Sequence, residues 1–101
     1  MKSIIPQEQG TCFLCEAFQE HNSNILHEHH IFEGCRRKKS EQYGLKVNLC
    51  MTHHTGDING NKKAVHFNKE YDLMLKEMAQ RVFEETHTRE EFRKEFGKSW
   101  L

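Results

Sequence analysis

The clearest pattern in the chain is the spacing of apolar side chains after Asn68. They recur every three or four residues, which is typical of a helix that buries one face. The stripe consists of Tyr71, Leu75, Met78 and Val82, widened by Met74, Ala79 and Phe83. This spacing predicts a helix over residues 69–85, with Asn68 as its N-cap.

A second, shorter helix is predicted to follow. Thr88 and Glu91 have the spacing of a capping box, and Phe92 and Phe96 fall on one helical face ahead of Gly97, a natural stop. Neither helix carries residues that suggest chemistry. We therefore expect both helices to pack as a buttress against the rest of the chain.

The first two thirds of the chain show only short apolar segments. "NILHEHHIF" predicts a short strand or hairpin, "LKVNLC" predicts a second short strand, and "MTHHTG" predicts a short helix ended by Gly56. Residues 16–24 are polar and typical of turns. Residues 34–44 predict a basic loop with one helical turn over residues 40–43. The expected fold class is α+β, in one domain over residues 1–101, with a core at 11–67 and a helical extension at 68–101.

Composition indicates that this core needs reinforcement. Only 36% of the 101 residues are hydrophobic and 30% are charged, so little apolar surface is available for burial. Neither a signal peptide nor an apolar run long enough to span a bilayer is apparent, which favours a cytoplasmic location. Thiols stay reduced there, so the four cysteines favour metal binding over two disulfides.

Two short motifs supply a set of metal ligands. Cys12 and Cys15 form a CxxC pair, and Cys50 and His53 have the same spacing. Three thiolates and one imidazole suit a tetrahedral structural zinc ion. A redox CxxC would require a βαβ context that this chain lacks. Cys35 could replace one ligand, but it has no partner at this spacing.

Two pairs of adjacent histidines remain to be explained. His29 and His30 lie in the first predicted strand, and His54 directly follows the last zinc ligand. Neighbouring side chains on a strand point to opposite faces, so His29 and His30 cannot easily bind one ion together. One of them could bind a metal while the other faces a water molecule.

Positive charge brackets this histidine-rich region although the net charge is zero. The basic residues between positions 36 and 63 are Arg36, Arg37, Lys38, Lys39, Lys46, Lys62 and Lys63. Only Glu41 and Asp57 oppose them in that segment. Such a cluster is often a solvated face, but it can also contact phosphates.

The motifs over residues 12–66 resemble the HNH, or ββα-metal, nuclease superfamily. They occur in the order "CFLC", "HHI", "LCMTHH" and "VH". Small phage-type members, including the RecA-dependent recombination-enhancement nuclease, are the nearest in character. The resemblance implies that His29, His54 and His66 bind a catalytic metal and that His30 is the general base. The Asn of the family name has no clear counterpart, and Asn48 is one candidate.

The chemistry of phosphodiester cleavage agrees with these roles. A divalent metal stabilises negative charge on the phosphate, and a neutral imidazole can accept a proton from water. Arg36, Arg37, Lys38 and Lys39 could hold flanking phosphates. We therefore expect a metal-dependent DNA endonuclease, phage-encoded, with structural Zn²⁺ and catalytic Mg²⁺, Mn²⁺, Ni²⁺ or Zn²⁺. Its partners would be DNA and a recombination or packaging protein. The alternative is a zinc-ribbon-like module that binds nucleic acid or protein without catalysis.

Overall fold

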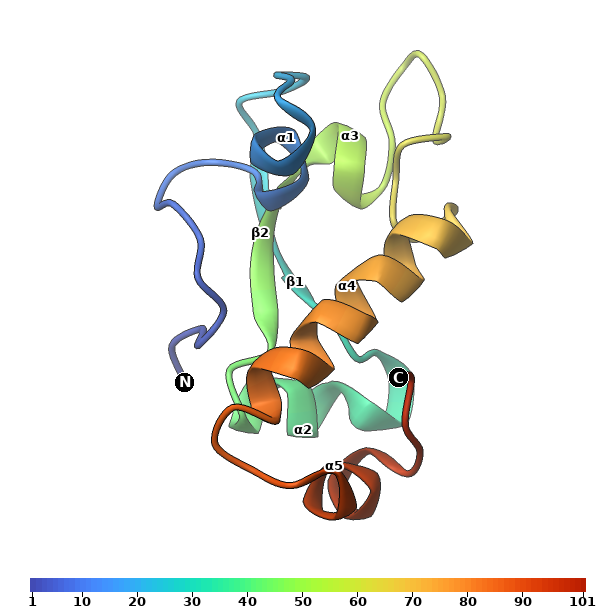
Figure 1. Cartoon of the computed structure of the whole chain (residues 1–101). Helices are drawn as coiled ribbons and strands as arrows, with labels where there is room; N and C mark the ends of the chain where they lie inside the picture. The colour runs from blue at the N-terminus through green and yellow to red at the C-terminus, as the bar shows by residue number, and fades with distance from the viewer.

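Two antiparallel strands form the centre of the fold (Figure 1). In the computed structural model, which describes residues 1–101, β1 (Leu26–His30) pairs along its whole length with β2 (Lys46–Cys50). The alternation of side chains places His29 and His30 on opposite faces of this hairpin. Both predicted strands are therefore confirmed.

The connection between the strands is more helical than expected. A 3₁₀ turn, η1 (Gly34–Arg36), leads directly into α2 (Arg37–Gln42), where the sequence predicted a loop with one helical turn. The buried Ser40 hydroxyl donates to the Leu45 carbonyl and accepts a hydrogen bond from the backbone N–H of Phe32. These bonds join the two ends of the connection, where β1 ends and β2 begins.

Two short helices lie at the other end of the hairpin (Figure 1). α3 (Met51–His54) follows β2 directly, as predicted. α1 (Phe13–Phe18) was not anticipated, because residues 16–24 looked turn-like. The Cys12 thiol caps α1 by accepting a hydrogen bond from the Cys15 N–H. The residue that starts this helix therefore also belongs to the CxxC metal-binding motif.

The two C-terminal helices follow the sequence closely. α4 (Lys69–Phe83) begins at Asn68, whose side chain accepts a hydrogen bond from the Tyr71 N–H. α5 (Arg89–Phe96) begins with a complete Thr88–Glu91 capping box and ends at Gly97 in a left-handed conformation. The helix signals in this part of the chain are local, which explains why they could be read directly.

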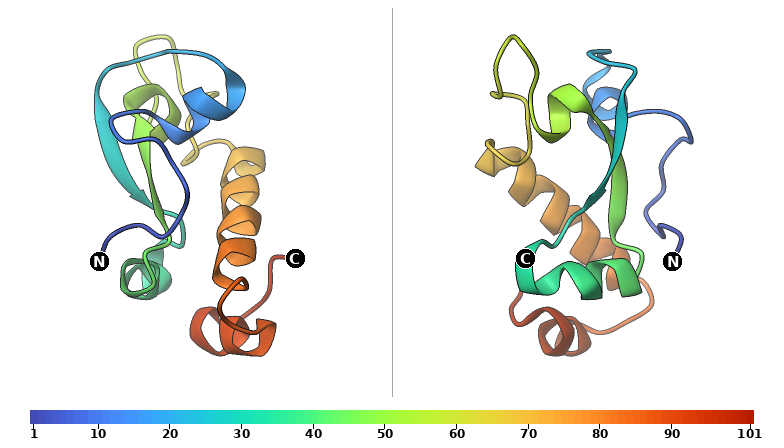
Figure 2. Two further views of the ribbon diagram at one scale, coloured as in Figure 1. Left: turned by 60° about the vertical axis from the view of Figure 1, so that its left-hand side comes forward. Right: turned by 180° about the vertical axis from the view of Figure 1, so that it is seen from behind.

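These helices buttress the hairpin as expected (Figure 2). α4 flanks the hairpin, and α5 packs beneath α2 at one end of the molecule. Phe32, two residues after the His29–His30 pair, is fully buried against the rings of Phe92, Phe96 and Trp100. The C-terminal extension therefore anchors the end of the strand that carries both histidines.

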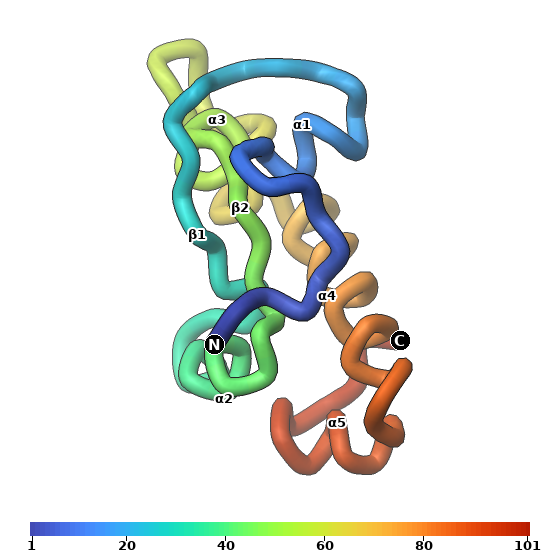
Figure 3. The backbone as a smooth tube through the Cα atoms, turned by 90° about the vertical axis from the view of Figure 1, so that its left-hand side faces the viewer, coloured from blue at the N-terminus to red at the C-terminus, as the bar shows by residue number.

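The N-terminal segment runs beside the outer edge of β2 (Figure 3). The Ile4 N–H donates to the Gly44 carbonyl, and the Gln7 side chain accepts a hydrogen bond from the Asn48 N–H. Gly44 has a φ of 68°, and a Cβ atom there would lie 2.4 Å from the Lys2 carbonyl oxygen. This close approach requires glycine. None of the helices has the length and apolar character needed to cross a membrane.

Candidate metal centres

Three cysteines and one histidine meet at the end of the hairpin, between α1 and α3. Cys12 and Cys15 come from the start of α1, Cys50 ends β2, and His53 lies in α3. All four are buried, and one ligand atom from each lies within 4.8 Å of the others. The four residues named from motif spacing are thus brought together by the fold.

The distances within this Cys₃His cluster fit one tetrahedral ion. The Cys15 and Cys50 sulfur atoms are 3.7 Å apart, and His53 Nδ1 lies 3.4–3.6 Å from the three sulfurs. A tetrahedral zinc ion with bonds of about 2.3 Å to sulfur and about 2.0 Å to nitrogen separates its ligand atoms by roughly 3.5–3.8 Å. The cluster is therefore consistent with a structural Zn²⁺ site.

The surroundings of the cluster also suit a metal. Glu20 Oε1 lies 2.9 Å from His53 Nε2, the ring nitrogen that faces away from the thiols, although it is not aligned to accept a good hydrogen bond. A carboxylate in this position typically orients a metal-bound imidazole. Burial raises the pKa of the Cys12 thiol to about 12. The thiolate form of Cys12 therefore needs a cation to stabilise it inside the fold.

Three further histidines converge on the face of the hairpin opposite His30. His29 comes from β1, His54 ends α3, and His66 precedes α4, and their nearest ring nitrogens lie within 4.8 Å of one another. The Nε2 atoms of His54 and His66 are 3.1 Å apart. Two imidazole nitrogens bound at about 2.1 Å to one ion lie roughly 3.0–3.4 Å apart, so the pair has suitable spacing.

His29 is the buried member of this three-histidine cluster. Its side chain is 2% exposed, and its Nε2 atom has no hydrogen-bond partner. A buried polar atom without a partner is costly, and a metal ion would satisfy it. This orphaned atom is the strongest observation for a ligand at the cluster.

Two histidines of this cluster, His29 and His54, are held in their neutral, metal-binding form. Burial and then the neighbouring imidazoles lower the pKa of His29 to about 3 and that of His54 to about 4. His27 Nδ1 lies 2.9 Å from His54 Nδ1, on the side of the ring away from His66. His27 can therefore orient His54 as an outer-shell partner.

A polar pocket of about 300 Å³ connects the cluster with His30. His29 and His30 both line it although they leave β1 on opposite faces. The remaining lining residues are Glu28, Glu33, Arg37, His54 and His66. His30 also lies 2.7 Å from Glu41 through its Nε2 atom.

Glu33 belongs to this pocket and was not identified from the sequence. Its two carboxylate oxygens lie 3.6 Å from His29 Nε2 and 3.7 Å from His66 Nδ1. Burial raises the pKa of this carboxyl group. The sequence spacing of four residues from His29 did not predict this contact, because the chain leaves β1 and turns between the two residues.

The four basic residues predicted to hold phosphates occupy different environments. The Arg36 guanidinium donates to the Phe96 carbonyl at 2.6 Å and lies over the Trp100 ring. Lys39 pairs with Glu95 of α5 at 2.5 Å. Arg37 and Lys38 are exposed, and Arg37 alone of the four lines the histidine pocket.

The chain matches no protein-family model, and neither a curated protein nor a solved structure gives a significant match. The geometry of the two candidate centres is therefore the basis for interpreting this small α+β protein. One centre is the buried Cys₃His cluster at the end of the β-hairpin, and the other is the three-histidine cluster beside it.

Proposed function

We propose that this protein is a metal-dependent DNA endonuclease of the HNH, or ββα-metal, type. The observation that carries the proposal is the buried, unpartnered Nε2 atom of His29, a residue that clusters with His54 and His66 beside a pocket that His30 also lines. This combination offers an open metal site and a separate imidazole within one polar pocket. The order of β1, β2 and α3 around the site supports the same assignment.

The two centres would have different roles. Cys12, Cys15, Cys50 and His53 would hold a buried structural Zn²⁺ that fixes α1 and α3 to the hairpin. His29, His54 and His66 would hold an exchangeable divalent ion, which supplies Lewis-acid stabilisation of the scissile phosphate. Three imidazoles favour a transition metal, and waters and phosphate oxygens could complete a Mg²⁺ or Mn²⁺ site.

The protein's own residues would manage the proton and the substrate. His30 accepts a proton from a water molecule in the pocket, whose oxygen then bonds to phosphorus while the bond to the 3′-oxygen breaks. The 3′-oxygen takes a proton from solvent, which leaves a 5′-phosphate and a 3′-hydroxyl. Arg37 at the pocket rim and Lys38 beside it supply positive charge for flanking phosphates, contacts that orient DNA without reading its sequence.

The direct test is a plasmid-cleavage assay with Mg²⁺, Mn²⁺, Ni²⁺ or Zn²⁺, comparing wild type with His30→Ala. We expect wild type to nick or cut the plasmid and His30→Ala to cut about 10²–10⁴-fold more slowly, the usual contribution of a positioned base. His21→Ala is the control, because this exposed histidine is hydrogen-bonded to Asn24 and belongs to neither metal cluster. Equal rates for His30→Ala and wild type would remove the base assignment.

The same assay separates catalysis from binding. A wild-type protein that binds DNA but cuts it with none of the four metals would be a zinc-stabilised binding module. In that case, His30→Ala should bind DNA as well as wild type does.

A further inference from the structure

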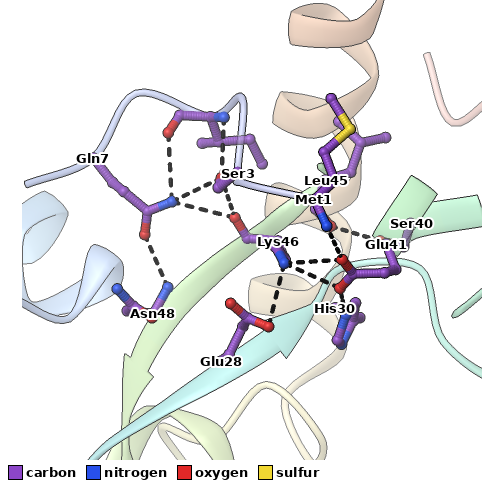
Figure 4. Close-up of polar contacts among 11 residues, drawn as sticks. Met1, Ser3, Gln7, Glu28, His30, Ser40, Glu41, Leu45, Lys46 and Asn48 are labelled. Carbon is purple, nitrogen blue, oxygen red and sulfur yellow. Dashed lines mark hydrogen bonds and ion pairs between the residues drawn. The ribbon is translucent and has the colours of Figure 1, made fainter. Parts of the chain in front are cut away.

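The His30 ring makes one hydrogen-bonded contact with the protein, and the partner is a carboxylate. Its Nε2 atom lies 2.7 Å from Glu41 Oε1, across the gap between β1 and α2 (Figure 4). Only 10% of the His30 side chain is exposed, so the ring is confined by its surroundings. No protein group is hydrogen-bonded to the other ring nitrogen, Nδ1.

This contact determines which nitrogen of neutral His30 carries the proton. An ionised carboxylate only accepts hydrogen bonds, so a 2.7 Å contact requires the proton on Nε2. Nδ1 then carries the lone pair. A neutral imidazole whose free nitrogen carries the lone pair is the form that can accept a proton from water.

Glu41 is itself held by positive groups. Lys46 Nζ lies 3.0 and 3.1 Å from its two oxygens, and the Met1 amino group lies 2.5 Å from Oε2 (Figure 4). Hydrogen bonds from the Met1 amino group, His30 and Lys46 hold the pKa of this carboxyl group well below its usual range. Glu41 thus remains an anionic acceptor at neutral pH.

The carboxylate also has a defined position. Glu41 lies in α2, whose buried Ser40 is hydrogen-bonded to both ends of the β1–β2 connection. Lys46 begins β2 and pairs with His30 across the hairpin. The acceptor and the imidazole are therefore placed by the same local structure, and neither is a member of the Cys₃His cluster or of the three-histidine cluster.

We infer that Glu41 is a positioning residue for His30: it holds the imidazole with Nε2 protonated and Nδ1 available to the pocket. The inference rests on the proposed nuclease function for its catalytic consequence. Glu41 touches neither substrate nor metal in this role, and it acts only through the orientation and tautomer of His30.

The experiment combines cleavage kinetics with ¹⁵N NMR of the His30 ring in the zinc-loaded protein. Spectra are recorded at about pH 8, above the ordinary imidazole pKa, and the His30 signals are assigned with His30→Ala. We expect wild type to show protonated Nε2, and Glu41→Ala to show a mixture of tautomers. Glu41→Ala should lower kcat by roughly 10- to 100-fold with little change in KM, the range seen when the orienting partner of a metal-bound histidine is removed.

Two further variants keep the test specific. Glu41→Gln retains an oxygen that can accept from Nε2, so it should restore the tautomer and part of kcat even if Glu41→Ala folds poorly. Glu95→Ala is the matched control, because it removes a carboxylate that pairs with Lys39 of α2 but does not contact His30. It should leave both the His30 spectrum and kcat at wild-type values.

The outcomes separate this inference from the proposed function. If wild type cuts DNA and His30→Ala does not, but Glu41→Ala retains both wild-type kcat and the Nε2 tautomer, then the role of Glu41 is overturned and the nuclease stands. If Glu41→Ala and Glu95→Ala lower kcat equally, Glu41 is only a structural residue. A wild type that cuts with none of the metals overturns the catalytic role of Glu41 together with the nuclease proposal.

Discussion

His29 and His30 are adjacent in sequence and identical in chemistry, yet they have opposite environments. Strand alternation turns His29 toward two other imidazoles and His30 toward a carboxylate. His29 is left with a buried nitrogen that lacks a partner, whereas His30 has an anionic acceptor. Position on the strand thus determines which histidine suits a metal and which suits proton transfer.

The first prediction at this scale tests the proposed second metal ion. His54→Ala should weaken Mn²⁺ binding at the three-histidine cluster by at least roughly tenfold, because it would remove one of the three nitrogen ligands proposed for this ion. His30→Ala should bind Mn²⁺ as wild type does, since its ring lies on the other face. Isothermal titration measures both affinities, and elemental analysis should find the structural zinc retained in each variant. Equal Mn²⁺ affinities for His54→Ala and wild type would exclude His54 as a ligand.

The second prediction concerns pH and stability. Burial lowers the pKa of His29 to about 3, so below the ordinary value of about 6.5 the unfolded chain binds a proton that the folded protein does not. Above that value His29 is neutral in both states and its burial adds no pH dependence, whereas from pH 6.5 down to about pH 3 its burial lowers the unfolding free energy progressively. Between pH 6.5 and about pH 5, His29 should cost about 2 kcal/mol of unfolding free energy.

Urea titrations of the protein without the second ion test this dependence. His29→Gln cannot titrate, so its unfolding free energy should fall less steeply than that of wild type over the same range. Both proteins contain the same Cys₃His cluster, so any effect of pH on that cluster cancels when the two slopes are subtracted. Parallel slopes would show that His29 is not the group responsible.

At the scale of elements, α2 has two functional faces. Arg36, at the end of η1, and Lys39 tie α2 to the C-terminal segment through Phe96 and Glu95. Arg37 and Lys38 point into solvent, with Arg37 beside the histidine pocket. A run of four basic residues that looks uniform in the sequence is therefore divided by helical geometry between packing and an exposed surface.

This division predicts opposite effects for neighbouring arginines. If the protein binds DNA as proposed, Arg37→Ala should weaken that binding about equally across sequences and lower the slope of log affinity against log salt by about 1, since it would remove one phosphate contact. Arg36→Ala should leave that slope unchanged and reduce the unfolding free energy by about 1–3 kcal/mol, because it loses a charged hydrogen bond and a ring contact. Fluorescence anisotropy and urea unfolding provide the two measurements. If Arg36→Ala changes the salt slope as much as Arg37→Ala does, the division is wrong.

Elements whose signals are local could be predicted from the sequence. The stripe and N-cap of α4 and the capping box of α5 are encoded within a few residues, and the ligand spacing of the Cys₃His cluster is similarly short-range. α1 was missed because its cap is a cysteine, a residue that spacing had already assigned to metal binding.

The supporting residues of the site could be predicted only in part. His27 shares a strand face with His29 two residues later, so alternation could have identified it. Glu33 and Glu41 reach the histidines through the turn after β1 and through the pairing of α2 with the hairpin. Their contacts depend on tertiary structure, which no short spacing encodes.

At the scale of the whole molecule, the hairpin is held at both ends by different means. The Cys₃His cluster joins α1 and α3 to one end, and an aromatic cluster of Phe32, Phe92, Phe96 and Trp100 closes the other end. The histidine pocket lies between these two anchors. Its geometry therefore depends on both, although neither contributes a ligand to it.

The zinc anchor should contribute most of the stability. Binding of structural zinc is worth about 10–16 kcal/mol at neutral pH, as much as or more than the total stability of about 5–15 kcal/mol of an ordinary domain. Cys50→Ser replaces one thiolate, and we expect it to be largely unfolded or aggregated. Cys35→Ser is the matched control, because Cys35 is exposed and lies outside the cluster. Circular dichroism and elemental analysis should find Cys35→Ser folded with one tightly bound zinc ion per chain and Cys50→Ser without either property. A folded wild type that contains no zinc, or a Cys50→Ser variant as stable as Cys35→Ser, would show that the protein is held together by its apolar core alone.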